Sequence, residues 1–320
     1  MRVSRVLAGK FRRYAHFSTI DYIKHPSIMI FNLLDLFKVA FGCLQSKIMI
    51  LFWRPDVVFV KGGFVGLPVG LSVGRRPLVI HDSDTVPGLT NRILARRACK
   101  IATGMPLKNY DYDRSRSVYV GIPVAKSLKP PTASQQAKAK ARFDFDPKRK
   151  LIVITGGGLG AKRLNDAVFS QREFLLKHAQ ITLIAGRDQR EELGYCADGE
   201  GFKVYGFAND MDTLLSAADI VVARAGATTI AELAALAKPT VLVPNAMLPG
   251  SHQVKNAAVL VEAGAAKVLG DDELDNLTSV VREILDNPRV SKKLSTSIHK
   301  FAKPDAAKDL AKIILKATDY

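Results

Sequence analysis

Short apolar runs recur along the chain, and a stretch with helical spacing follows most of them. The runs are continuous in Val, Ile and Leu rather than alternating, which is typical of strands buried on both faces. Their alternation with helices predicts βαβ units and parallel sheets, and hence an α/β fold of doubly wound domains. The runs are 56–61, 77–81, 117–120, 150–156, 181–186, 203–207, 219–226, 239–244 and 265–270.

Residues 126–150 interrupt this pattern, because they contain three prolines, several lysines and few apolar residues. Such a composition predicts an interdomain linker with a short helix. A new strand starts at Lys150, and 320 residues are enough for two domains. We therefore predict one domain over 1–147, a second over 148–303 and a C-terminal helix over 304–320.

The most apolar stretch is 28–53, and it lacks the roughly 18 uninterrupted apolar residues that a membrane-spanning helix needs. The favoured interpretation is a long helix packed in the core. The alternative is a helix partly exposed to a bilayer surface, with Lys38 and Lys47 near the lipid headgroups. The polar residues that interrupt the stretch are Asn32, Asp35, Lys38, Gln45 and Lys47.

The net charge of +17 is concentrated in the front half of the chain. Residues 1–150 hold 27 Lys and Arg against 9 Asp and Glu, whereas residues 151–320 hold 20 against 21. A basic half predicts an anionic partner, which leaves nucleic acid, an anionic lipid surface or a phosphorylated substrate; a solvated basic face is the simpler alternative. No nucleic-acid recognition module is visible, so we expect no nucleic-acid partner.

The cysteines give no sign of a disulfide framework or a zinc site. Cys43, Cys99 and Cys196 lie far apart, form no CxxC pair and are odd in number. This pattern favours free thiols in a reducing cytoplasm.

A first glycine turn, VITGGGLGAKRLN, occupies residues 153–165. Gly156, Gly157 and Gly158 follow a strand and precede a helix, so their amides and the helix N-terminus suit a phosphate. It is not a Walker loop, because Ala161 and Arg163 stand at positions that would require Gly and Ser or Thr. A tight turn without a ligand remains the alternative.

A second turn, ARAGATTIAE, covers residues 223–232. Its free amides and the hydroxyls of Thr228 and Thr229 suit a second anionic group. One turn further, the Glu232 carboxylate suits both hydroxyls of a ribose, although it also fits an ordinary first-turn acid. Two glycine turns and one acid fit a nucleoside diphosphate better than either turn alone.

A third segment, VPNAMLPGSHQVKNA, covers residues 243–257 and leads into a helix. Its His252, Gln253 and Asn256 carry amide and imidazole groups that suit sugar hydroxyls. A helix cap with surface polar residues is an equally good interpretation.

Together these stretches resemble the rear domain of family-28 glycosyltransferases, and most of all the MurG family. The segments KGGFVGLPVG (61–70), HDSDTVPGLTNRILARRA (81–98) and VGIPV (120–124) are similar to its front domain, in the same order. The resemblance runs from about residue 50 to the end and implies a GT-B fold of two Rossmann-like domains. It also implies transfer of N-acetylglucosamine from UDP-N-acetylglucosamine to lipid I, giving lipid II for peptidoglycan synthesis.

The resemblance further implies where each substrate binds. Glu232 would hold the ribose, the Ala208 backbone the uracil, and Gln253 the sugar hydroxyls. A peripheral location on the cytoplasmic face of the plasma membrane and a lipid-linked acceptor are also implied. The expected donor residues are Gly156, Gly157, Gly158, Ala208, Arg224, Ala227, Thr228, Thr229, Glu232 and Gln253, and the expected acceptor-side residues are Gly62, Gly63, Asp84 and Asn91.

The chain departs from the family pattern in several places. The family opens with a strand, a glycine-rich loop and a His some 60–70 residues before this chain begins, so we expect a shortened first domain. That His is the family's favoured general base. In its absence Asp84, with the nearby His81, is the candidate here, although the favoured interpretation of Asp84 is a capping residue before Pro87. Asp84 replaces an Asn, Gly158 a Ser, and Ala125 an Arg.

The expected chemistry is direct displacement with inversion, in which a base removes the acceptor proton and amides stabilise the departing UDP. We expect no cofactor or metal, since no paired carboxylates stand beside the phosphate turns. Two alternatives are another lipid-acceptor UDP-sugar transferase, such as one acting on diacylglycerol, and a non-catalytic UDP-sugar-binding fragment.

Overall fold

The computed structural model describes residues 3–12, 25–157, 161–187, 189 and 199–319. The chain forms two compact units. Unit 1 comprises residues 1–123, 247–252 and 305–320. Unit 2 comprises residues 124–246 and 253–304.

Unit 2 is built on a six-stranded sheet in which every pair of neighbouring strands is parallel. The strand order is β10-β9-β8-β5-β6-β7, and the strands are filled with buried Val, Ile and Leu, as the continuous apolar runs predict. The strands are β5 (Leu151–Thr155), β6 (Gln180–Ile184), β7 (Phe202–Tyr205), β8 (Ile220–Ala223), β9 (Thr240–Leu242) and β10 (Lys267–Val268).

The direction of winding reverses between β5 and β8. From β5 the chain proceeds outward through β6 and β7, then returns to place β8 on the other side of β5 and continues to β9 and β10. The carboxyl ends of the strands beside such a switch point are the usual ligand site of a doubly wound sheet. Both glycine turns of the sequence lie there, after β5 and after β8.

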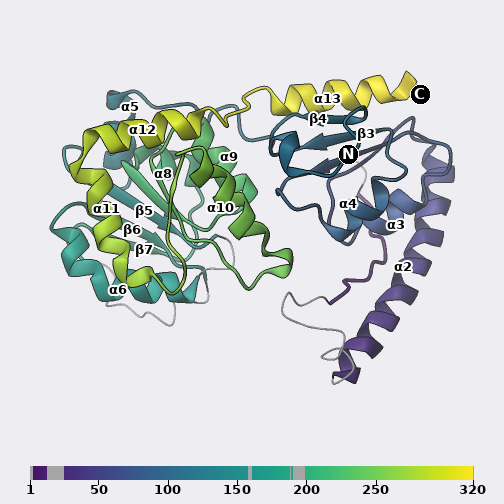
Figure 1. Cartoon of the computed structure of the whole chain (residues 1–320), viewed down its shortest axis with the longest axis horizontal. Coiled ribbons are helices and arrows are strands. Elements are labelled where there is room, and N and C mark those ends of the chain that lie inside the picture. The colour runs from purple at the N-terminus through teal and green to yellow at the C-terminus, as the bar shows by residue number, and fades with distance from the viewer. Residues whose placement is uncertain (1–2, 13–24, 158–160, 188, 190–198, 320) are drawn as a thin grey trace. The chain divides into compact units, whose positions relative to one another are not determined.

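Helices cover both faces of this sheet (Figure 1). Contacts join α6 to α11, α9 to α12 and α5 to α8. The helices of unit 2 are α5 (Ala133–Arg142), α6 (Lys162–Leu176), α8 (Met211–Ala217), α9 (Ala227–Ala235), α10 (His252–Glu262, from its second residue), α11 (Leu277–Asp286) and α12 (Pro288–His299), with a 3-10 turn η4 (Leu274–Asn276).

Unit 1 contains a four-stranded parallel sheet in the order β1-β2-β3-β4. Its strands are β1 (Val58–Val60), β2 (Leu78–Asp82), β3 (Lys100–Thr103) and β4 (Ser117–Tyr119). Its helices are α2 (Pro26–Trp53), α3 (Gly66–Leu71), α4 (Leu89–Leu94) and α13 (Ala306–Lys316), with 3-10 turns η1 (Leu107–Asn109), η3 (Pro249–Ser251) and η5 (Ala317–Asp319). Two parallel α/β domains are therefore present, as the sequence predicts.

The linker segment belongs to unit 2 rather than standing between the units. In α5, a Thr132–Gln135 capping box fixes the first turn, and Lys140 is buried against Asp219 with a 2.6 Å ion pair. The unit boundary therefore lies near residue 123 and not near 148. Sequence composition did not reveal this, because the contacts of a polar helix with a distant strand leave no local pattern.

The last helix packs on the sheet of unit 1. Leu310 is buried beside Ala102 and Val120, and Ile313 and Ile314 pack against the same cluster. Asp305 stands at the N-cap position of this helix.

The apolar stretch forms one continuous helix of 28 residues, α2, at the edge of unit 1 (Figure 1). Its buried residues form one stripe along the helix, and only two of them have large apolar side chains. The buried residues are Asp35, Val39, Gly42, Ser46 and Ile50. The chain segment 3–12 lies against this stripe. A Cβ on Gly42 would be 1.9 Å from the Leu7 carbonyl oxygen, and one on Gly9 would be 2.1 Å from that of Asp35.

Polar side chains of α2 hold that segment in place. Gln45 accepts a hydrogen bond from the Leu7 amide at 2.9 Å and donates one to the Arg5 carbonyl at 2.8 Å. Asn32 accepts one from the Arg12 amide at 2.8 Å. Asp35 forms ion pairs with Arg12 and Lys38, both at 3.0 Å. The polar residues therefore mark the packed face of the helix.

The favoured interpretation of α2 as a core helix is wrong, because its large apolar side chains point outward. Only 17% of its most apolar window is buried. Among the described helices α2 alone is long and apolar enough to cross a membrane, by length and composition. Its exposed apolar residues are Met29, Ile30, Phe31, Leu33, Leu34, Leu36, Phe37, Phe41, Leu44, Ile48, Leu51, Phe52 and Trp53.

Candidate functional site

The two glycine turns of unit 2 lie side by side. Thr155, the last residue of β5, pairs with Ala223, the last residue of β8, and the Arg224 amide donates to the Thr155 carbonyl at 3.3 Å. Gly157 adopts a φ of +81°, which favours glycine, and its amide donates to the Thr155 hydroxyl. Gly156 precedes it, and Gly158 lies outside the described residues.

Each turn leads into a helix whose first turn has no acidic residue. In α9, Gly226 is the N-cap and none of the described side chains caps the amides of Ala227, Thr228 and Thr229. These amides and the helix dipole leave a positive end at the switch point, which suits a phosphate. In α6 the N-cap is Ala161, whose side chain makes no capping hydrogen bond.

Glu232 lies in the second turn of α9 and is half-buried. Burial raises the pKa of its carboxyl group, and the nearby charge of Asp212 adds to this effect. None of the described residues donates a hydrogen bond to the carboxylate. A half-buried carboxylate in this state is ready to accept hydrogen bonds from a pair of ligand hydroxyls.

Arg224 and Gln253 fasten the loops around the switch point. The Arg224 guanidinium donates to the Val243 carbonyl at 3.0 Å and to the Asp271 carboxylate at 2.7 Å. The Gln253 side chain accepts a hydrogen bond from the Asn245 amide at 2.8 Å. Arg224 thus lies at the predicted site, but its guanidinium links the loops that hold Val243 and Asp271. The sequence analysis did not predict Asp271 as its partner.

Two further features complete this edge of unit 2. Asn256 of α10 is fully buried and donates to the Ala225 carbonyl at 3.1 Å, which fixes α10 against the second turn. Ala208 lies in the loop between β7 and α8, next to Phe207, which is 54% exposed. The guanidinium carbon of Arg187 lies 4.9 Å from the centroid of the Phe207 ring. An exposed aromatic ring at this edge is a surface on which a planar base can stack.

In unit 1, the carboxyl end of β2 carries a second polar cluster. His81 is fully buried; its Nε2 is 2.9 Å from the Gly121 carbonyl, and its Nδ1 has no hydrogen-bond partner among the described residues. Burial lowers the pKa of His81, so the ring is neutral, and the carbonyl assigns the proton to Nε2. The Asn91 side-chain amide donates to the His81 carbonyl, while Asn91 Oδ1 accepts no hydrogen bond within the described part of the chain.

The buried carboxylate of this cluster is that of Asp82, which the sequence analysis did not name; its candidate was Asp84. Asp82 accepts a hydrogen bond from the Tyr112 hydroxyl at 2.5 Å. Burial raises the pKa of Asp82, although the hydrogen bonds from Tyr112 and Asn91 oppose that shift. A buried carboxyl group with a raised pKa is suited to accept a proton near neutral pH.

The remaining predicted acceptor-side residues surround this cluster. Gly62 and Gly63 follow β1 with φ values of +80° and +75°. A Cβ on Gly62 would be 3.2 Å from the Asn91 amide nitrogen. The Asp84 backbone carbonyl accepts a hydrogen bond from the Tyr110 hydroxyl at 2.8 Å. The structure therefore brings Gly62 and Asn91 together. It places Asp84 in the loop that follows β2.

No group of three or more His, Cys, Asp or Glu side chains that could hold a metal ion occurs among the described residues.

Comparison with known sequences gives matches in both halves of the chain. Residues 10–103 match the glycosyltransferase family 28 N-terminal domain, and residues 151–310 match the glycosyltransferase family 28 C-terminal domain. A Geobacillus kaustophilus protein named UDP-N-acetylglucosamine–N-acetylmuramyl-(pentapeptide) pyrophosphoryl-undecaprenol N-acetylglucosamine transferase is 35% identical over 288 residues, 88% of this chain and 76% of the relative. A Bacillus cereus protein of the same name, numbered 2, is 30% identical over 316 residues, 98% of this chain and 84% of the relative.

Solved structures give the same result. The Acinetobacter baumannii MurG structure superposes with a TM-score of 0.67 at 26% identity, over 88% of this chain and 79% of that one. The calicheamicin glycosyltransferase CalG4 superposes with a TM-score of 0.62 over 94% of this chain and 82% of that one. At 13% identity this second likeness concerns the fold alone.

Proposed function

This chain belongs to glycosyltransferase family 28, and on that premise we propose that it transfers N-acetylglucosamine from UDP-N-acetylglucosamine to lipid I, giving lipid II. It is a glycosyltransferase of GT-B fold. The observation that carries the proposed substrates is that relatives named for this transfer match up to 98% of the chain. The paired glycine turns and the available Glu232 carboxylate support the same donor.

On the donor side, we assign each group of the switch point one task. The amides of Ala227, Thr228 and Thr229 bind the phosphates and stabilise the negative charge on the departing UDP. Glu232 accepts both ribose hydroxyls, the loop at Ala208 holds the base, and Gln253 binds sugar hydroxyls. Arg224 acts as a positioning residue, because its ion pair with Asp271 fixes the loops on both sides of the second turn.

On the acceptor side, we assign the proton acceptor to Asp82. Its carboxylate lies at the carboxyl end of a central strand and has a raised pKa. Tyr112 holds one carboxylate oxygen, so the side chain is fixed in orientation. The acceptor hydroxyl would lose its proton to Asp82 as it attacks the anomeric carbon, and inversion follows from this single displacement.

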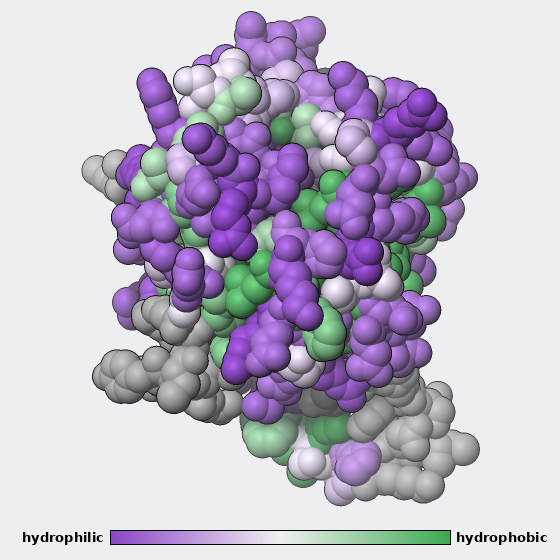
Figure 2. All heavy atoms as spheres, turned by 90° about the vertical axis from the view of Figure 1, so that its left-hand side faces the viewer, coloured by the Kyte–Doolittle hydropathy of each residue, from purple (hydrophilic) through white to green (hydrophobic). Residues whose placement is uncertain are grey.

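We further propose that α2 binds the cytoplasmic face of the plasma membrane. Its 13 exposed large apolar side chains follow one another along a single helix, and a contiguous exposed apolar patch marks a protein or membrane contact. Its packed face holds Asp35 and the segment 3–12, which favours a helix lying on the bilayer over one crossing it. By contrast, the face of unit 2 seen in Figure 2 is mainly hydrophilic, with apolar side chains in small, separate groups.

The transfer reaction is tested with the purified full chain, UDP-N-acetylglucosamine labelled in the sugar, and lipid I in anionic vesicles. Labelled lipid II and free UDP should appear together. Turnover with diacylglycerol but not with lipid I would show that diacylglycerol, and not lipid I, is the acceptor. Donor binding without turnover on either lipid would overturn the catalytic proposal and leave a UDP-sugar-binding protein.

A further inference from the structure

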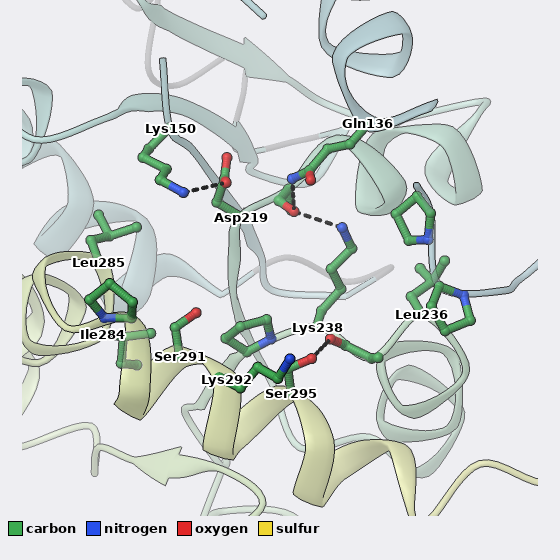
Figure 3. A pocket seen from close by; sticks show the side chains of 16 residues that line it. Gln136, Lys150, Asp219, Leu236, Lys238, Ile284, Leu285, Ser291, Lys292 and Ser295 are labelled. Carbon is green, nitrogen blue, oxygen red and sulfur yellow. Dashed lines mark hydrogen bonds and ion pairs between the residues drawn. The ribbon is translucent and has the colours of Figure 1, made fainter. Parts of the chain in front are cut away.

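Unit 2 contains a cavity of about 450 Å³ on the edge of its sheet opposite the glycine turns (Figure 3). Its lining includes Lys150, Asp219 and Lys238, which directly precede or closely approach the first residues of β5, β8 and β9. In a parallel sheet all amino ends lie on one edge, so this cavity is separate from the switch point. Its volume is in the range that small ligands occupy.

The charge on the walls is unbalanced. The lining holds three lysines, Lys150, Lys238 and Lys292, and a single carboxylate, Asp219. That carboxylate is already engaged by Lys150 at 3.1 Å and by Lys140, just behind the wall, at 2.6 Å. Four ammonium groups thus line or border the cavity against one carboxylate, and a bound anion would restore the balance.

The charge of Lys238 is energetically costly to bury, because only 4% of this residue is exposed to solvent. Its ammonium group donates to the carbonyls of Ser216 and Ala218, both at 2.7 Å. These are two of its three donors, and neither acceptor carries a full charge. Burial lowers its pKa to about 8, so the group is still mostly protonated at neutral pH.

The opposite wall is α12, which supplies further donors (Figure 3). Ser291, Lys292 and Ser295 line the cavity from successive turns of this helix. The Ser295 hydroxyl donates to the Ala237 carbonyl at 2.7 Å, whereas none of the described residues bonds the Ser291 hydroxyl or the Lys292 ammonium group. The apolar part of the lining includes four prolines and the side chains of Leu236, Ile284 and Leu285.

From this arrangement we propose that the cavity is a second ligand site of unit 2, which binds a small phosphate-bearing anion between Lys150, Lys238 and the Ser291–Lys292 turn of α12. Phosphate suits these walls because lysines bind it as point charges and hydroxyls donate to its remaining oxygens. The strands β5, β8 and β9 begin beside this cavity. Their carboxyl ends lead into the donor-binding segments, so a ligand in the cavity would stiffen these strands at their amino ends. The binding itself does not depend on the transfer reaction.

The test is local lysine acetylation of the full chain, read by mass spectrometry, with pyrophosphate as the probe and sodium chloride at matched ionic strength as the reference. Lys292 and Lys150 should be acetylated at least threefold more slowly with pyrophosphate. Lys293, the exposed neighbour of Lys292 outside the cavity, should be unaffected. Because the readout is confined to these lysines, pyrophosphate bound at the donor turns does not alter the result.

Calorimetry with UDP present in excess, so that the donor turns are filled, gives a second measurement. Lys292→Glu should weaken pyrophosphate binding at least about tenfold, the loss expected for one charge-assisted contact. Lys293→Glu makes the same charge change on the same helix and should alter binding less than twofold. Unchanged acetylation of Lys292 and Lys150, equal protection of Lys293, or equal weakening by both variants would each overturn the proposal.

Discussion

Glu232 is the side chain on which donor recognition depends most directly. Its carboxylate is half-buried and receives no hydrogen bond from the described residues, so a ribose would supply the missing donors. Glu232→Ala removes two charge-assisted hydrogen bonds and should weaken UDP-N-acetylglucosamine binding about a hundredfold. Titration calorimetry on the full chain measures this directly.

The matched control is Glu173→Ala, which removes an exposed glutamate from α6 of the same unit and should leave the affinity unchanged. The pH dependence gives a further check. Since burial raises the pKa of Glu232, donor affinity should decline on acidification at a higher pH than an exposed glutamate would cause. An unaltered affinity in Glu232→Ala would contradict the assigned ribose contact.

Tyr112 opposes the effect of burial on the pKa of Asp82. Its hydroxyl stabilises the ionised carboxylate, so Tyr112→Phe should raise the pKa of Asp82 further. A base must be deprotonated to act, and the acid limb of the kcat/KM profile should therefore move to higher pH. Measuring kcat/KM across the pH range tests this shift, while Asp82→Asn should abolish turnover and retain donor binding.

Tyr110→Phe serves as the comparison, because Tyr110 stacks on Tyr112 but donates to the Asp84 carbonyl. Its acid limb should stay close to that of the wild type. Asp84→Asn should likewise remain active if Asp82 is the base. An active Asp82→Asn, or an inactive Asp84→Asn with intact donor binding, would return the role to Asp84.

These two sites differ in how far sequence could reveal them. The donor turns and Glu232 lie within short contiguous segments, where strand, glycine and helix follow one another, so their geometry is largely local. Asp82 is the last residue of β2, whereas Tyr112 lies 30 positions later in the loop between β3 and β4, so their contact is a tertiary one. No spacing rule connects an aspartate at a strand end to a tyrosine in a later loop, and the sequence analysis therefore named Asp84 without considering Asp82.

At the scale of elements, strands were predictable where apolar runs were continuous. Each of the nine predicted runs overlaps a strand of the structure, but β3 was missed because its sequence, KIAT, begins with Lys and ends with Thr. The existence of α2 was predictable, but its orientation was not. A helix with apolar residues on most of its circumference has no distinct core face, and tertiary contacts with segment 3–12 decided which side packs.

The attachment of α5 to unit 2 depends on a buried ion pair that can be tested. Burial opposes ionisation of Asp219, but Lys140 and the Leu151 amide hold its pKa below the ordinary value. Asp219→Asn leaves the buried Lys140 charge without a carboxylate and should lower the free energy of unfolding by about 3 kcal/mol. Denaturant unfolding at neutral pH measures the loss.

The sign of the pH effect follows from the lowered pKa. The stabilisation by Asp219 is complete above its unfolded-state pKa and is lost as the pH falls through the lower folded value, so the variant and the wild type should converge in acid. Asp144→Asn is the control. Asp144 pairs with Lys203, and its side chain is 87% exposed. It should change stability by less than about 1 kcal/mol. An equal loss in both variants would contradict the buried role.

At the scale of the whole molecule, the two units divide charge and apolar surface between them. The basic excess of residues 1–150 and the exposed apolar face of α2 belong mostly to unit 1, whereas the donor turns belong to unit 2. A lipid-linked acceptor is delivered by a membrane and a nucleotide sugar by solution. A division of this kind is therefore what a transfer between these two phases requires.

This division predicts that unit 1 carries membrane binding. Phe37→Ser with Phe41→Ser removes two exposed rings from α2 and should reduce flotation with phosphatidylglycerol vesicles at least about tenfold. Phe174→Ser removes a 59% exposed ring from α6 of unit 2 and should leave flotation unchanged. Vesicles of phosphatidylcholine should bind the wild type more weakly, because the basic residues then lack an anionic surface. Equal flotation of both variants would exclude α2 as the contact, and equal binding to both lipids would show that the basic charge has another partner.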